Sequence, residues 1–117
     1  MIKREWQRMI NRTKHSWWGL IDTWSGEPSF KFWTCVNVAS ATLALLLPLT
    51  TPERALILAL GILILAAECL NTGIEHVVDH LSPEPHPLAK KAKDASSAGV
   101  ALAAIAAGIA WLVVLLG

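Results

Sequence analysis

Three long apolar stretches, at residues 30–49, 55–79 and 94–116, constrain the fold of this chain more than any other feature. A helix needs about 20 apolar residues to cross the hydrocarbon core of a bilayer, and each stretch is close to that length. Hydrophobic residues make up 54% of the 117 residues, which is unusual for a small soluble protein. The sequence therefore predicts an all-α integral membrane protein, a single domain over residues 1–117 with three transmembrane helices.

The lysines and arginines outside these stretches predict how the chain is oriented. Six cations lie at or before the start of the first stretch, one lies between the first and second, and three lie before the third: Lys3, Arg4, Arg8, Arg12, Lys14 and Lys31; Arg54; Lys90, Lys91 and Lys93. The positive-inside rule then places the N-terminus and the second loop in the cytoplasm and the C-terminus outside. The net charge of +1 predicts no nucleic-acid partner.

Residues 3–25 are predicted to form an amphipathic helix ahead of the first span. Apolar and aromatic side chains recur at helical spacing on one face, and basic residues including Arg8 and Arg12 occupy the other. A basic face opposite a tryptophan-bearing face suits a helix that lies in the membrane interface beside anionic headgroups. Packing on the soluble surface of a partner is the alternative.

The second stretch carries polar residues at membrane depth. Glu68, Asn71, Glu75 and Asp79 fall on one narrow stripe of a helix. Ionisable groups at this depth are costly, so such a stripe predicts a functional site. Glu68 lies about 10 Å deeper than Glu75, at 1.5 Å per residue.

Further charged residues are predicted to meet this stripe at the cytoplasmic membrane face, namely Glu27, Lys93 and Asp94. Converging carboxylates suit Mg²⁺, which proteins hold through one or two carboxylates plus substrate phosphates. The chain has no P-loop and no kinase-type HRD or DFG sequence, so a nucleotide site here belongs to neither class. His76 and His80, four residues apart, are an alternative zinc pair without an evident third ligand.

The third stretch is rich in alanine and glycine, which let membrane helices approach each other closely. Three thin helices enclose several carboxylates poorly, so we expect a homo-oligomer. Cys35 and Cys69 both lie within predicted spans, and we expect both to be reduced packing residues.

The residues from Glu68 to Asp79 resemble the E-x-L-N-[ST]-x-I-E-x-V-V-D signature of the prokaryotic diacylglycerol kinase family, which includes undecaprenol kinases. The alanine, lysine and aspartate at 92–94 resemble the family's A-K-D run, and the SWWGL sequence near Ser16 and the position of Glu27 also fit. This resemblance covers essentially the whole chain. It implies a small kinase of the bacterial inner membrane, with a surface helix and three spans per subunit, assembled as a homotrimer with active sites shared between subunits.

The resemblance also implies a chemistry and residue roles. The γ-phosphate of MgATP is transferred to the hydroxyl of diacylglycerol, with Glu68 as the general base and with Glu27 and Glu75 holding the divalent ions. The remaining residues implied to line the nucleotide are Arg8, His15, Asn71, Asp79, His86, Lys93 and Asp94. Desolvated carboxylates, Mg²⁺ and a lysine are groups that phosphoryl transfer uses.

Two positions depart from the family pattern. Trp33 stands where relatives carry a further acidic residue, which predicts simpler metal coordination around Glu27. His15 replaces an aromatic residue and alters the expected adenine contacts. Undecaprenol kinase is the alternative within the enzyme class, and a small ion-conducting subunit is the alternative outside it, because a row of Glu and Asn through a span also suits an ion pathway.

Overall fold

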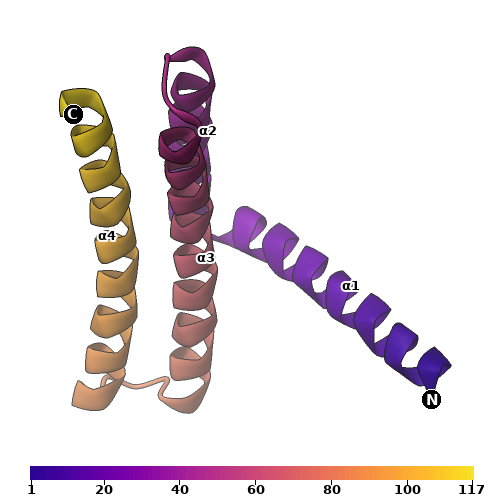
Figure 1. The fold of residues 1–117 in the computed structure, drawn as a ribbon. Helices are drawn as coiled ribbons and strands as arrows, with labels where there is room; N and C mark the ends of the chain where they lie inside the picture. Colours follow the sequence, from indigo (N-terminus) through magenta and orange to yellow (C-terminus); the bar gives the residue numbers. More distant parts are fainter.

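A computed structural model describes residues 1–117, which form four α-helices and no strands. Helix α1 runs over Ile2–Gly26, α2 over Pro28–Leu46, α3 over Thr51–Leu81 and α4 over Pro87–Leu116. Figure 1 shows α3 and α4 standing side by side, with α1 projecting sideways from the other helices. Glu27 is the only residue between α1 and α2, and its extended backbone turns the chain from one helix into the next.

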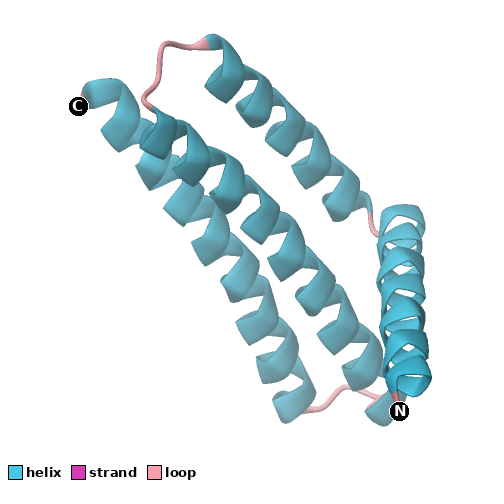
Figure 2. Ribbon diagram, turned by 45° about the vertical axis from the view of Figure 1, so that its right-hand side comes forward, coloured by secondary structure: helices cyan, strands magenta, loops and turns pink.

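Helix α3 is the central element, because it contacts each of the other three helices. The loop between α2 and α3 lies at one end of the bundle and the loop between α3 and α4 at the other (Figures 1 and 2). We call these the hairpin end, residues 47–50, and the loop end, residues 82–86. Glu68 lies in the half of α3 nearer the loop end.

The helix boundaries differ from the predicted spans for identifiable reasons. Helix α3 begins at Thr51 because Thr50 and Glu53 form a reciprocal capping box, with Thr50 N donating to Glu53 Oε1 at 2.8 Å. Helix α4 begins at Pro87, seven residues before the predicted apolar segment, where proline at the first helical position costs no hydrogen bond. The loop between α3 and α4 is therefore confined to residues 82–86.

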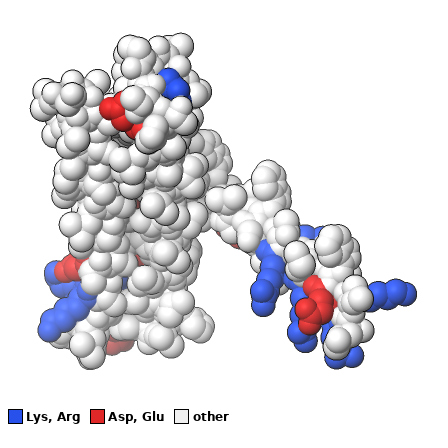
Figure 3. All heavy atoms as spheres, in the orientation of Figure 1, with Lys and Arg blue, Asp and Glu red and all other residues white.

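Helices α2, α3 and α4 are each long and apolar enough to cross a membrane. Much of their apolar surface is uncovered in the single chain; Leu46 and Leu70, for example, are 76% and 70% exposed. In Figure 3 the charged side chains gather on α1 and at the two ends of the bundle, while the band between those ends is almost free of charge. That distribution suits helices surrounded by lipid rather than by water.

The best-packed part of the bundle lies toward the hairpin end. Ala44, Ile57 and Ala110, one from each of α2, α3 and α4, form a buried apolar cluster. The indole of Trp111 on α4 donates to Ser40 Oγ on α2 at 2.8 Å. Small residues at these contacts let α2 and α4 each approach α3 closely, which is how helices pack where water supplies no driving force.

The backbone carbonyls at the end of α2 are satisfied by one side chain. The guanidinium of Arg54 donates to the carbonyl oxygen of Ala44 at 2.8 Å and to those of Leu47 and Leu49 at 3.3 Å. The last carbonyls of a helix have no partner within the helix, and a cation there also interacts favourably with the helix dipole. Arg54 therefore fastens the α2–α3 hairpin.

Candidate functional site

Glu68 is the deepest carboxylate of the polar stripe on α3 and is only 4% exposed. Its Oε2 accepts a hydrogen bond from the hydroxyl of Ser29 in the first turn of α2, at 3.3 Å. Glu27 and Glu75 are its charged neighbours. A buried carboxylate is expensive unless it is partnered, so the contact with Ser29 fixes one oxygen while leaving capacity for a further donor.

One turn closer to the loop end, Asn71 and Glu75 connect α3 to α4. Asn71 Nδ2 donates to Glu75 Oε1 at 3.3 Å, and Asn71 Oδ1 accepts from Ser96 Oγ at 2.7 Å. The side-chain amide of Asn71 thus contacts Glu75 through its nitrogen and Ser96 on α4 through its oxygen. The spacing of four residues between Asn71 and Glu75 places them on one face of α3.

At the loop end the stripe reaches a pair of opposite charges between two helices. Lys93 on α4 forms an ion pair with Asp79 on α3. A second pair, Lys90 Nζ and Asp94 Oδ2, lies within α4 at 2.6 Å. Both lysines precede the apolar part of α4.

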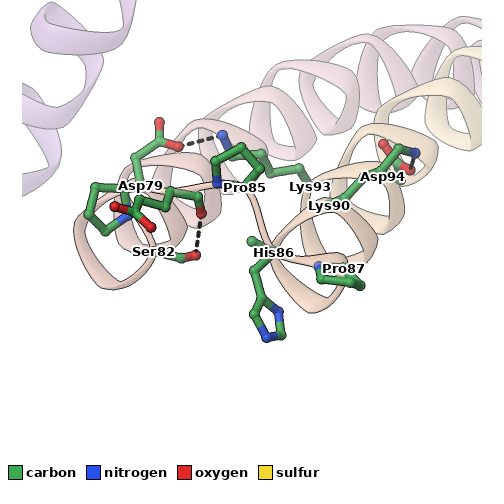
Figure 4. A pocket seen from close by; sticks show the side chains of 11 residues that line it. Asp79, Ser82, Pro85, His86, Pro87, Lys90, Lys93 and Asp94 are labelled. Carbon is green, nitrogen blue, oxygen red and sulfur yellow. Dashed lines mark hydrogen bonds and ion pairs between the residues drawn. The ribbon is translucent and has the colours of Figure 1, made fainter.

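These two pairs line a cavity of about 700 Å³ between the end of α3, the loop and the start of α4. Figure 4 shows the side chains of Asp79 and Lys93 pointing toward each other and joined as an ion pair. The volume falls within the range of ordinary small-molecule sites. Its lining holds two lysines, which are suited to phosphate oxygens, and three carboxylates, those of Asp79, Glu84 and Asp94.

His86 has a structural contact here. Its Nδ1 accepts a hydrogen bond from the backbone N–H of Leu88 at 3.1 Å, so it caps the N-terminus of α4. In Figure 4 its ring points away from the Asp79–Lys93 pair. His86 lines the cavity, but its Nδ1 already accepts the hydrogen bond from the backbone N–H of Leu88.

Arg8 and His15 both lie on α1, apart from the stripe on α3. The ring of His15 packs near that of Trp18, with centroids 5.7 Å apart, and both Arg8 and His15 are exposed. Neither has a hydrogen bond or ion pair to another helix. The structure therefore brings together the predicted residues of α3 and α4 but not these two.

No group of three or more His, Cys, Asp or Glu side chains is close enough to enclose a metal ion within the single chain. The carboxylates around Glu68 nevertheless have the donor chemistry for Mg²⁺, which keeps several waters and takes only one or two protein carboxylates together with phosphates. Glu27 and Glu75 fit that requirement as separate ligands. They do not form a closed site by themselves.

Sequence reasoning missed several residues that complete this region. The hydroxyl of Ser29 donates a hydrogen bond to Glu68, and that of Ser96 donates one to Asn71. Lys90 forms an ion pair with Asp94. Serines carry no distinctive signal in an apolar sequence, and the partner of each depends on how α2 and α4 pack on α3. The pairing of Lys90 and Asp94 was available from their spacing of four residues.

Comparison with known proteins shows which family this chain resembles. The family described as prokaryotic diacylglycerol kinase matches residues 14–115. A diacylglycerol kinase of Pseudomonas aeruginosa is 39% identical over 111 residues, which cover 95% of this chain and 90% of that protein. The diacylglycerol kinase of Escherichia coli K12 is 34% identical over 108 residues, covering 92% and 88%.

An undecaprenol kinase of Bacillus subtilis is 32% identical over 114 residues, covering 97% of this chain and 93% of that protein. The family match spans most of the chain, including α3 with its buried Glu68 and the start of α4 with Lys93. With relatives above 30% identity over nearly the full length, this chain belongs to the prokaryotic diacylglycerol kinase family.

Proposed function

We propose that this protein is an integral membrane kinase that transfers the γ-phosphate of MgATP to diacylglycerol and releases phosphatidic acid. The observation that carries the proposal is the buried carboxylate of Glu68 at membrane depth, joined by a polar stripe to the lysine-lined cavity at the loop end. The relatives that carry the name diacylglycerol kinase support this choice of substrate.

In the proposed reaction Glu68 accepts the proton of the lipid hydroxyl. The hydroxyl oxygen forms a bond to the γ-phosphorus while the bond from that phosphorus to the β–γ bridging oxygen breaks, and ADP leaves. Burial of Glu68 excludes water, which would otherwise compete as acceptor. The Ser29 hydroxyl holds the carboxylate in one orientation during the proton transfer.

The charged residues around Glu68 divide between metal and nucleotide. Glu27 and Glu75 would hold Mg²⁺, which neutralises charge on the phosphates when it is bound. Lys93 binds the phosphate oxygens, and Asn71, Asp79 and Asp94 orient the surrounding groups. His86, Arg8 and His15 complete the nucleotide site in this proposal, the last two from α1.

The proposed arrangement in the membrane follows from the charges. Helix α1 lies in the cytoplasmic interface of the bacterial inner membrane, with its basic residues beside anionic headgroups. The loop end of the bundle is cytoplasmic, where ATP is found, and the C-terminus is outside. Exposed apolar side chains and an alanine-rich α4 support a homotrimer whose subunits together enclose the carboxylates.

The experiment that tests the function is phosphate transfer from γ-labelled MgATP by purified protein in mixed micelles containing diacylglycerol, undecaprenol or no lipid. Labelled phosphatidic acid as the main product confirms the proposal. Labelled undecaprenyl phosphate as the main product assigns the activity named for the Bacillus subtilis relative instead. Absence of any labelled lipid from folded protein contradicts both.

A further inference from the structure

A second cavity, of about 880 Å³, lies between α1 and α3, apart from the lysine-lined cavity at the loop end. Its lining is mostly small or polar, and Leu20 and Cys69 are its only hydrophobic residues. Polar groups come from both helices: Ser16, Asp22, Thr23, Glu27, Thr72 and His76. The cavity combines mainly apolar lining surface with polar groups from two helices, which suits the head region of an amphiphilic molecule.

Thr72 lines this cavity and carries the only buried side-chain polar atom of the chain that has no hydrogen-bond partner. Its side chain is 5% exposed, and Oγ1 makes no hydrogen bond although it is completely buried. Other threonines in this chain satisfy their hydroxyls by donating to the carbonyl four residues earlier, as Thr23 does to Gly19 at 2.7 Å. A buried hydroxyl without a partner is destabilising, so a ligand that accepts a hydrogen bond from Thr72 would remove that cost.

The position of Thr72 relative to Glu68 indicates what that partner is. The two residues are four apart on α3, so their side chains are neighbours on one helix face, with Cβ atoms about 5–6 Å apart. The lysines that suit phosphate line the other cavity, and Thr72 does not. Thr72 thus offers a donor beside the base and away from the phosphate-binding lysines.

We propose that Thr72 binds the acceptor lipid, its hydroxyl donating a hydrogen bond to the oxygen that is phosphorylated while that oxygen's own proton points to Glu68. This inference rests on the proposed function for the identity of the acceptor. Two contacts from one helix face hold the reacting oxygen at a fixed height in the membrane. Positioning of this kind is a large part of what phosphoryl transfer requires.

The test compares Thr72→Val, which keeps the shape but removes the hydroxyl, with Thr72→Ser, which keeps the hydroxyl. For Thr72→Val we expect kcat/KM for diacylglycerol to fall about 3- to 10-fold, the effect of one neutral hydrogen bond. The KM for MgATP stays within about twofold of wild type, and Thr72→Ser stays near wild type in both. If Thr72→Val lowers the unfolding midpoint, Thr72→Ala repeats the measurement without the added methyl group.

A second readout does not depend on turnover. Cys69 lines the same cavity and both cysteines are free thiols, so Cys35→Ala leaves Cys69 as a reporter. Bound diacylglycerol should slow alkylation of Cys69 by N-ethylmaleimide, and Thr72→Val should require about 3- to 10-fold more lipid for the same protection.

Three results overturn the inference. The first is that Thr72→Val changes neither kcat/KM for diacylglycerol nor the protection of Cys69, and the second is that Thr72→Val weakens MgATP binding as much as it lowers kcat/KM for the lipid. The third is that Thr72→Ser loses as much as Thr72→Val in either measurement. Failure of the proposed function looks different, because the wild-type protein would then label no diacylglycerol at all. The alkylation measurement still reports whether the lipid occupies the cavity in that case.

Discussion

The two ends of the helix bundle satisfy their polar groups in opposite ways. At the hairpin end the donors and acceptors are used within the fold: Arg54 binds three carbonyls, and Thr50 and Glu53 cap α3. Toward the loop end Glu68 and Lys93 each have a single partner, and Lys93 lines a cavity. One end is therefore built for stability, while the other retains charge and hydrogen-bonding capacity for ligands.

Removing the proposed base should have the largest effect on activity. Glu68→Gln keeps the size of the side chain but cannot accept a proton, so we expect lipid phosphorylation to fall at least about 100-fold. Initial rates in mixed micelles measure this loss. The Kd for MgATP, measured by titration calorimetry, should stay within about twofold, and substantial remaining activity would mean that Glu68 is not the base.

Lys93→Met should weaken nucleotide binding without abolishing the chemistry. The ammonium lines the loop-end cavity beside Asp79, and its loss removes a charge-assisted hydrogen bond worth about 1.5–3 kcal/mol. We expect the Kd for MgATP to rise about 10-fold or more. Lys91→Met is the matched control, since Lys91 is exposed on the same helix and does not line the cavity; equal effects of both substitutions would contradict a specific role for Lys93.

Gly61→Ala should affect stability rather than catalysis. A Cβ at Gly61 would lie 2.0 Å from Asn37 Oδ1, so the Asn37 side chain has to rotate away from α3. We expect a loss of about 1–3 kcal/mol, as for other overpacked contacts, with kcat unchanged below the unfolding transition. The measurement is the thermal unfolding midpoint in detergent.

A double-mutant cycle tests the cause of that loss. Adding Asn37→Ala removes the atom with which the new Cβ collides, so Gly61→Ala should cost less in that background. Additive losses would show that the cost has another origin.

The smallest predicted effect is at the contact between α2 and α4. Trp111→Phe keeps a ring but removes the hydrogen bond to Ser40, which should cost about 0.5–1.5 kcal/mol of stability. Ser40→Ala should cost a similar amount, and the two losses should not add, because they remove the same bond. A change in kcat from either variant would contradict the separation between the two ends.

Hydrophobic patterning was sufficient for much of the fold. Apolar length predicted three helices able to span a membrane, and α2, α3 and α4 meet that criterion. Helix α4 begins before the predicted span of 94–116, because its first turns carry lysines, which a span predicted from hydropathy leaves out. They are helical because Pro87 begins the helix and His86 caps it.

The candidate site was predictable along α3 but less so across helices. Helical spacing alone placed Glu68, Asn71, Glu75 and Asp79 on one stripe. The partners Ser29 and Ser96 come from other helices, and their contacts depend on packing that spacing does not encode. The unpartnered hydroxyl of Thr72 is likewise visible only in three dimensions.

The most direct test of separate roles for the two ends is a paired measurement on Glu68→Gln and Glu53→Gln, which make the same chemical change in α3, one in the half nearer the loop end and one in the first turn. Lipid phosphorylation and the unfolding midpoint are determined for both variants at equal amounts of folded protein. We predict that Glu68→Gln loses phosphorylation and keeps its midpoint, while Glu53→Gln lowers the midpoint through its weakened cap and keeps phosphorylation. Equal loss of phosphorylation in both variants, or full activity in Glu68→Gln, would contradict the account.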